Sequence, residues 1–402
     1  MNPIPTRSAA VAALLLLPAF AFGRMTAFEG EALARAVPVQ FGGGAVFSPV
    51  WFEFDCAVIA GLADPEARER MRARMDVIVE SIDAYFAPLY RVCSSMTVSN
   101  AVETASARFL AVGDPSRVDA GLRAWMQRTY GMETCRSTFA EGVDAWVRAK
   151  MDGRMEDFAM PPEIETENRY SLFDIVFLRP SWRTPFSPAN DRRAGFACEG
   201  GGSVTLPYFT ATANFVTYET EKWAVVRLPL RDRSWFYAAV PKEAVTLGEM
   251  RRELTYTRLR NVLTVMGAGR AMQANRGPVE VWLPAFSVTS DVDVSGIMDH
   301  FGFPLGPFPS LGGDLRPGLL RQRVVFRVDR GTALPAPPAD ADRRRRTDDE
   351  EDDDDEEGAS PSVGAVRREP RVFELNRPFL FFVHHVPSDT MTVYGQFTGT
   401  EN

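Results

Sequence analysis

The sequence predicts an α+β fold, with helices concentrated in the N-terminal half and strands in the C-terminal half. Between positions 65 and about 130, apolar residues recur at spacings of three and four, which is typical of helices. After about position 170 the apolar runs are short and rich in β-branched and aromatic residues, as strands are. Because the two kinds of element are separated along the chain, we expect sizeable sheets rather than alternating units around a parallel sheet.

Individual elements can be placed by their end signals. Asp64 is a candidate N-cap, and Pro65 suits the first position of the helix that follows. A second helix is expected from Ala140 to Met151, ending at Gly153. The expected strands are Ser171 to Leu178, Ser203 to Tyr208, Ala224 to Leu228, Trp235 to Val240, Val279 to Leu283, Val324 to Val328, Phe379 to Val383 and Met391 to Tyr394.

The composition is that of an ordinary globular protein, with 402 residues of which 45% are hydrophobic. The net charge of −8 argues against general affinity for nucleic acid. Only Lys150, Lys222 and Lys242 are lysines, whereas the total of lysine and arginine is 45. This arginine bias indicates a strongly biased genome and is a hint of origin.

The first residues read as a signal peptide at positions 1–23. Arg7 precedes an apolar run from Ala9 to Phe22 that is broken only by Pro18, and a small-residue cleavage pattern ends at Gly23. The alternative is a membrane anchor, but the run is shorter than the about 20 residues that a spanning helix needs. We therefore expect a secreted, extracellular protein with one domain at positions 24–402 and no membrane attachment after cleavage.

The four cysteines show no short repeated spacing, which speaks against a zinc site or a disulfide framework. In an oxidising compartment one bridge could form, and buried free thiols are at least as well supported. The sequence does not choose between the three pairings of Cys56, Cys93, Cys135 and Cys198.

One segment, at about positions 334–370, is of low complexity. A stretch rich in proline and alanine leads to four arginines at 343–346 and then to an unbroken acidic run from Asp348 to Glu357. Self-repulsion and the scarcity of apolar residues predict that this insert is disordered and exposed.

The C-terminal motifs Asn376-Arg377-Pro378-Phe379 and Gly395-Gln396-Phe397 resemble the C-terminus of the serpin superfamily, and further motifs match upstream in the same order. Each lies in the strand or helix context that the resemblance requires. These motifs are Phe47-Ser48-Pro49, Trp146 with Gly153-Arg154-Met155, the set Trp182, Phe186, Pro188 and Phe196, the strand Val279 to Phe286, and Met298 to Gly302. The resemblance covers about residues 26 to 398.

The resemblance implies a serpin-like fold with a large central mixed sheet, further sheets and an exposed reactive loop. It also implies a monomer that is not an enzyme, needs no cofactor and traps a serine protease. In this mechanism the cleaved loop inserts into the main sheet as a new strand. The loop hinge that the resemblance assigns is Asp329, Arg330, Gly331, Thr332 and Ala333.

Several residues depart from what insertion requires. Pro335, Pro337 and Pro338 each remove a backbone donor from the new strand, at a cost on the order of 3 kcal/mol each by analogy with a helix interior. Farther on, the arginine and acidic runs would bring charges into the sheet. The position where the family usually has a shutter asparagine reads Asp174, and that of its histidine partner reads Arg321.

Three interpretations of the loop arginines stay open. Arg367 and Arg368 lie near the expected scissile bond and are candidate bait for a trypsin-like protease. The arginines at 343–346 could instead be a proprotein convertase processing site, or simply solvated charge beside the acidic run. The four residues concerned are Arg343, Arg344, Arg345 and Arg346.

No other chemistry stands out. His384 and His385 lie beside a predicted strand and would point to opposite faces, so we expect a structural role and no metal site. Two functions remain: an inhibitor that uses Arg367 or Arg368, and a non-inhibitory serpin-like protein that binds a host extracellular partner. The second is favoured by the prolines and charges. The acidic insert and arginine bias suggest a captured host gene in a large DNA virus.

Overall fold

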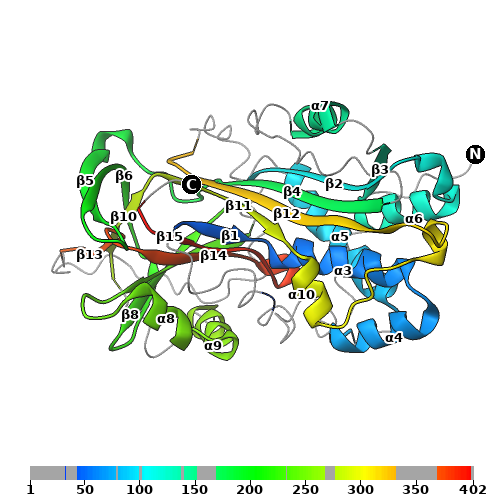
Figure 1. Cartoon of the computed structure of the whole chain (residues 1–402). Coiled ribbons are helices and arrows are strands. Elements are labelled where there is room, and N and C mark those ends of the chain that lie inside the picture. Colours follow the sequence, from blue (N-terminus) through cyan, green and yellow to red (C-terminus); the bar gives the residue numbers. More distant parts are fainter. Residues whose placement is uncertain are drawn as a thin grey trace, which may run out of the picture.

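The computed structural model describes residue 32 and the ranges 43–77, 80–98, 102–136, 140–151, 169–231, 233–267, 277–331 and 369–399 (Figure 1). The expected signal peptide at 1–23 lies outside these residues. So does nearly all of the expected insert, because positions 332–368 are not among them.

Three sheets form the body of the protein. The five-stranded sheet has the order β11 (Phe286–Asp293), β12 (Arg316–Val328), β4 (Arg169–Pro180), β2 (Val102–Val112) and β3 (Glu133–Arg136). The six-stranded sheet has the order β1 (Ala45–Phe47), β15 (Thr390–Phe397), β14 (Phe379–His385), β9 (Ser234–Pro241), β8 (Trp223–Pro229) and β7 (Val216–Glu219). The four-stranded sheet has the order β13 (Arg371–Glu374), β10 (Val279–Pro284), β6 (Ser203–Ala213) and β5 (Arg192–Ala197).

The helices precede, cover and connect these sheets. They are α3 (Pro49–Leu62), α4 (Pro65–Arg74), α5 (Ile82–Val98), α6 (Ala120–Tyr130), α7 (Ala140–Met151), α8 (Leu247–Glu253), α9 (Tyr256–Gly267) and α10 (Ser295–His300). None of the helices within the described ranges is both long and apolar enough to cross a membrane.

The five-stranded sheet has a core on each face. On one face α7 places Val147 and Met151 against Phe109 and Phe173, whose rings are stacked with centroids 5.0 Å apart. On the other face α3 contacts both β4 and β15 and is buried along almost its whole length. Figure 1 shows α7 on the opposite side of the sheet from α3. The five-stranded sheet is therefore covered on both faces, and β4 is buried from Tyr170 to Leu178.

The structure confirms the α+β fold and most of the expected elements. Asp64 caps α4 by accepting a hydrogen bond from the backbone N–H of Ala67 at 2.8 Å, and Pro65 occupies its first turn. Every expected strand lies within an observed one. The helix expected at Ala140 to Met151 is α7.

Other expectations were wrong or incomplete. The stretch from 65 to 130 was expected to be largely helical, but it contains β2, an 11-residue strand. The helical spacing was misleading here because β2 carries apolar residues on both faces. Strand β12 begins at Arg316, well before the expected Val324. Its first part was missed because exposed and half-buried residues there hide the alternation of apolar and polar side chains. Helices α8 and α9 were not predicted, whereas α10 ends at His300, within the motif Met298 to Gly302 that the resemblance matched to the end of a helix.

We expect Gly395→Ala to destabilise the protein because the six-stranded sheet leaves no room for a methyl group there. A Cβ on Gly395 would lie 2.5 Å from the carbonyl oxygen of Ala45 and 2.5 Å from the ring of Phe381. Overpacking of this kind costs about 1–3 kcal/mol. Urea unfolding measures the change in the free energy of unfolding. Gly195→Ala on β5 is the control, since its Cβ would meet nothing within 4 Å, and an equal loss in both variants would contradict the packing argument.

Candidate functional site

The site to which the sequence points is the seam between β12 and β4, two parallel strands at the centre of the five-stranded sheet. They pair directly from Arg316 opposite Arg169 to Phe326 opposite Leu178, with an irregularity between Pro317 and Leu320. Figure 1 shows β12 and β4 side by side along the length of the molecule. The seam is therefore closed, and a new strand could enter only if this ladder separated.

At the end of the seam where β12 leads into the loop, Trp182 fixes the backbone of the chain. Its indole N–H donates to the carbonyl oxygen of Asp329 at 2.7 Å. The Asp329 carboxylate also pairs with Arg179 on β4, with an N–O distance of 2.9 Å. Gly331 then turns the chain away with φ +77°, a backbone conformation that favours glycine. Three hinge residues are therefore described, and Arg330 among them pairs with Asp191.

Gln322 occupies the middle of the seam. Its side-chain oxygen accepts from the N–H of Ser48 at 2.8 Å, and its amide donates to the carbonyl of Ser48 at 2.9 Å. The same amide lies 3.4 Å from the Asp174 carboxylate on β4. Gln322 thus ties β12 to β4 and to the start of α3.

This arrangement corrects the expected partner of Asp174. Arg321 was expected to face it, but the register places Arg321 opposite Phe173 and Gln322 opposite Asp174. Since neighbouring residues of a strand point to opposite faces, Arg321 lies on the other face of the sheet, where it pairs with Asp291 at 3.4 Å. Sequence spacing alone missed the register by one residue.

A buried charge cluster, Asp55, Arg108 and Asp174, continues from the seam toward α3. Arg108 on β2 lies opposite Asp174 in the ladder, and its guanidinium is 3.3 Å from that carboxylate. It also donates to Asp55 on α3 at 2.6 Å and to the carbonyl oxygen of Tyr130 at 2.5 Å. All three charged side chains are at most 2% exposed. Two carboxylates therefore share one guanidinium in a site closed to water.

Burial disfavours the charged forms of both acids. Desolvation raises the pKa of Asp174 to about 6, although Arg108 and Gln322 act in the opposite direction. Desolvation and the neighbouring charge of Asp174 raise the pKa of Asp55 well above its usual range. One oxygen of each acid, Asp55 Oδ2 and Asp174 Oδ1, has no hydrogen bond among the described residues. The cluster is thus short of one positive charge when both acids are ionised.

The loop returns to the body at β13, which pairs with β10 in parallel. Arg371 at its start contacts Glu219 and Thr217 on β7. Val372 is 51% exposed and is, with Val386 at 43%, one of the two exposed large apolar side chains among the described residues. The two ends of the loop are therefore anchored to different sheets, β12 to the five-stranded sheet and β13 to the four-stranded one.

Most of the residues that the sequence singled out in the loop lie outside the described residues. These are the hinge residues Thr332 and Ala333, the prolines Pro335, Pro337 and Pro338, the arginines Arg343, Arg344, Arg345 and Arg346, and the bait candidates Arg367 and Arg368.

The cysteines and histidines have structural surroundings. All four cysteines are free thiols, of which Cys56 and Cys93 are buried. His384 contacts Asp389 at 2.8 Å, while His385 is buried and contacts Ser388 at 2.6 Å. Burial lowers the pKa of His385 to about 4, so the ring is neutral at physiological pH. No group of three or more metal-ligating side chains occurs within the described ranges.

Asp55, Arg108 and Gln322 were missed by the sequence analysis. A signal for Asp55 was present, because it interrupts the apolar run that opens at Pro49. Arg108 shows as a charge inside an apolar stretch between Ala107 and Phe109. That the two charges meet could not be read from the sequence, since they come from a helix and a strand 53 residues apart.

Comparisons with known proteins identify one family. The family model described as Serpin (serine protease inhibitor) matches residues 32–305. Mouse plasminogen activator inhibitor 1 is 24% identical over 270 residues, which cover 63% of this chain and 60% of the mouse protein. Human serpin B9 is 24% identical over 40% of this chain and 42% of its own length. The match to plasminogen activator inhibitor 1 of Neovison vison is longer, with 21% identity over 87% of this chain and 86% of the relative.

Solved structures share the fold. The crystal structure of native protease nexin-1 with heparin superposes with a TM-score of 0.73 at 15% identity, covering 92% of this chain and 96% of the other. Serpin-12 of Manduca sexta gives a TM-score of 0.70 at 13% identity with the same coverage.

We expect Asp174→Asn to stabilise the protein at neutral and alkaline pH. The folded protein holds a proton on Asp174 more tightly than the unfolded chain, whose aspartates titrate near pH 4. The contribution of this group is therefore fully present below about pH 4 and is lost as the pH rises through about 6. The neutral amide removes that loss, on the order of 3 kcal/mol at pH 8. Urea unfolding at pH 4.5, 6 and 8 follows the difference.

The matched control is Asp314→Asn, at an exposed carboxylate that pairs with Arg117 at 2.6 Å. Hydrogen bonding by Arg117 lowers the pKa of Asp314, so removal of this charge should not stabilise the protein at pH 8. A gain for Asp174→Asn that is the same at all three pH values would contradict the role of the buried carboxylate.

Proposed function

The chain belongs to the serpin family, and on that premise we propose that it is a secreted, non-inhibitory member that acts by binding an extracellular partner of the host. The observation that carries this proposal is the conflict between the closed seam of β12 and β4 and the residues that would have to enter it. The acidic insert and the arginine bias support a viral source, for which a host partner is expected.

Insertion of the loop makes two demands on its sequence. To enter the seam, the chain after Gly331 would have to turn back along β12, so an inserted strand would run antiparallel to β12 and β4, which are parallel to each other. A strand between two neighbours needs its N–H groups in the ladder, and it needs side chains that fit both buried faces of the sheet.

The segment after Gly331 meets neither demand. By alternation, Pro335 and Pro337 would lie on one face of the new strand and Pro338 on the other. The three prolines would leave unpaired carbonyl groups on both neighbouring strands, because a proline has no N–H to offer. At greater depth Asp340 and Asp342 would bring two more carboxylates into a sheet whose charge cluster already lacks a positive charge. Insertion is therefore opposed by backbone pairing and by charge.

An active inhibitor of a trypsin-like protease is the second candidate. Two observations favour it. No other strand lies between β12 and β4, so the place that an inserted loop would take is still unfilled. The hinge also contains Gly331, whose positive φ suits a turn. Several relatives carry the name plasminogen activator inhibitor 1. In this alternative Arg367 or Arg368 is the bait residue, and neither lies within the described residues.

Incubation of the mature chain with trypsin-like proteases separates the two functions. We expect cleavage in the segment 332–368, no complex that survives denaturing electrophoresis, and a melting temperature of the cleaved protein that is unchanged. Insertion would place a new strand between β12 and β4, add a ladder to the sheet and raise the melting temperature strongly. A covalent complex or such a rise would reject the non-inhibitory proposal.

The triple variant Pro335→Ala, Pro337→Ala and Pro338→Ala tests the physical reason. If the prolines block insertion, the cleaved variant should melt at a higher temperature than the cleaved natural protein. The control replaces the arginines at 343–346 by serine and leaves the prolines in place. An equal rise in the control would assign the block to charge rather than to missing backbone donors.

A further inference from the structure

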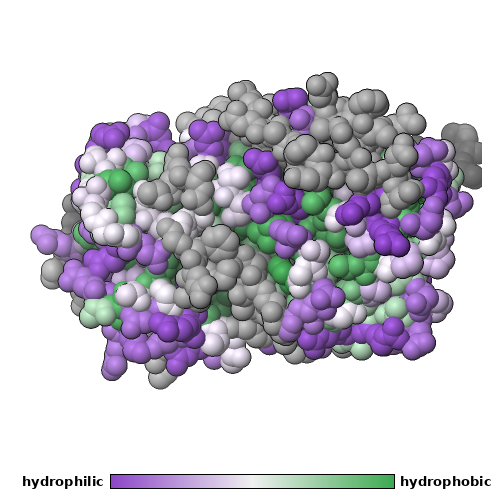
Figure 2. Space-filling view, viewed as in Figure 1, coloured by the Kyte–Doolittle hydropathy of each residue, from purple (hydrophilic) through white to green (hydrophobic). Residues whose placement is uncertain are grey.

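A pocket of about 490 Å³ lies far along the chain from the loop, where α8 and α9 pack beside the turn between β7 and β8. Figure 1 places these elements at one end of the molecule, and Figure 2 shows a mostly hydrophilic surface around β8 and α8. The pocket is lined by Tyr218, Thr220, Glu221, Lys222, Trp223, Glu253, Arg258, Asn261, Val262 and Val265. No proposed role of the loop uses these residues.

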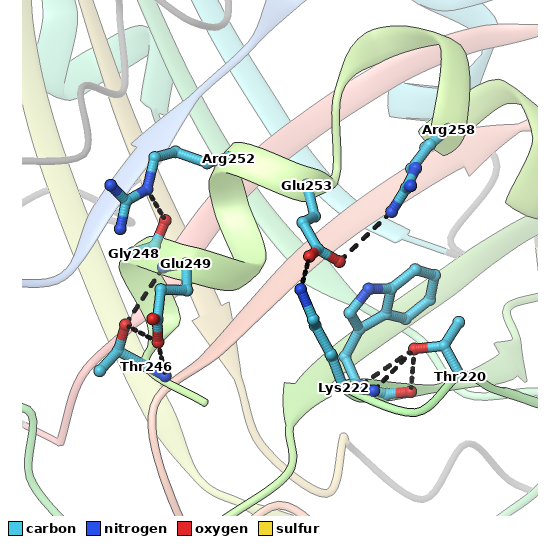
Figure 3. A network of polar contacts seen from close by, with 9 residues as sticks. Thr220, Lys222, Thr246, Gly248, Glu249, Arg252, Glu253 and Arg258 are labelled. Carbon is cyan, nitrogen blue, oxygen red and sulfur yellow. Dashed lines mark hydrogen bonds and ion pairs between the residues drawn. The ribbon is translucent and has the colours of Figure 1, made fainter. Parts of the chain in front are cut away.

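The polar side of the pocket is a network around one carboxylate. Figure 3 shows Glu253 of α8 between Lys222 and Arg258. Lys222 contacts one oxygen of Glu253, and Arg258 donates to the other at 3.3 Å. The hydrogen bond from Lys222 lowers the pKa of Glu253, which keeps it ionised at neutral pH. Two cations are thus held in place beside a single carboxylate.

The elements that carry these groups are fixed locally. Thr246 and Glu249 form a capping box at the start of α8, with the Thr246 N–H donating to Glu249 at 2.9 Å. In the turn that carries Lys222, the Thr220 hydroxyl accepts from the N–H groups of Lys222 at 3.2 Å and Trp223 at 3.1 Å. Figure 3 shows both motifs. A capped helix and a hydrogen-bonded turn hold Glu253 and Lys222 at the pocket before any ligand arrives.

Trp223 supplies an unused donor. The residue is 2% exposed and lines the pocket, yet its indole N–H has no hydrogen-bond partner among the described residues. A buried donor without a partner is unfavourable, and tryptophan N–H groups are usually paired when buried. An acceptor that entered beside the indole would recover part of this loss.

The remaining groups define the chemistry of a ligand. Lys222 has three N–H donors and Arg258 has five, and Glu253 accepts from only a few of them. The pocket therefore offers further N–H groups to a ligand. Val262 and Val265 of α9 and the ring of Tyr218 also line the pocket and give it an apolar part. The charges of Lys222 and Arg258 are balanced by Glu221 and Glu253, so the pocket does not favour a polyanion. It fits a compact molecule with one anionic group and an apolar body.

We propose that this pocket binds a small amphipathic anion. Its anionic group takes the spare N–H groups of Lys222 and Arg258, one of its acceptors reaches toward the Trp223 indole, and its apolar part packs on Val262 and Val265. The volume is within the range of pockets that hold small organic ligands. None of its lining residues belongs to β12, β4 or the loop, so the proposal does not rest on whether the protein traps a protease.

The test uses 8-anilino-1-naphthalenesulfonate, an aromatic molecule with one negative charge, titrated into the intact mature protein and followed by its fluorescence. We expect binding of one molecule per chain. Arg258→Glu should weaken that binding at least tenfold, because it replaces an exposed cation of the pocket by a carboxylate. Val265→Trp should abolish it by filling the apolar side. Thermal unfolding of each variant verifies that the fold is retained.

Two controls decide the interpretation. Arg377→Glu changes the charge of a second pocket of about 430 Å³ beside Lys242 and Glu374, and it should leave the titration unchanged. The neutral probe 1-anilinonaphthalene should bind at least tenfold more weakly than the sulfonate. The proposal is overturned if the natural protein does not bind the sulfonate, if Val265→Trp and Arg258→Glu bind it normally, or if the neutral probe binds equally well.

Discussion

The direct pairing of β12 with β4 is the interaction on which the rest of the structure depends. These two parallel strands lie between β11 and β2, and both cores of the molecule pack on the sheet that they complete. The pairing is reinforced at its end by the Trp182 hydrogen bond to Asp329 and at its middle by Gln322. A serpin that opens this sheet has to break all of these contacts, so the same strands set the stability of the protein and the barrier to any change of its loop.

The buried charge cluster of Asp55, Arg108 and Asp174 beside the seam acts against this stabilisation of the sheet. Removing two carboxylates and a guanidinium from water is expensive, and such groups are retained only where geometry repays part of the penalty. Here Arg108, Asp174 and Gln322 lie opposite one another on three neighbouring strands. Their side chains can therefore meet only when the strands pair in this register. Its excess negative charge means that the centre of the sheet becomes less stable as the solution becomes more alkaline.

The sequence predicted the class of fold, the helix cap at Asp64 and the family, because each depends on local patterns or on the order of motifs along the chain. It failed where distant segments decide the outcome. Strand β2 carries apolar side chains on both faces and therefore has no alternation to detect. Gln322 was missed in favour of Arg321 because a shift of one residue reverses the face of every side chain in a strand. The pocket beside Trp223 was not predicted, since it joins a turn to two helices that the sequence did not reveal.

The position of α3 has a consequence for the order in which the chain can assemble. This helix is almost entirely buried, and the hydroxyl of Ser48 at its start donates at 2.6 Å to the carbonyl of Thr392, 344 positions later. Neighbouring β1 pairs with β15, the last of the described strands. During synthesis the apolar surface of α3 emerges well before β15, because Ser48 and Thr392 are 344 positions apart, and it finds this final partner only once β15 has been made. Until then the nascent chain must shield it by provisional contacts or by a chaperone, and contacts of such high sequence separation make folding slow.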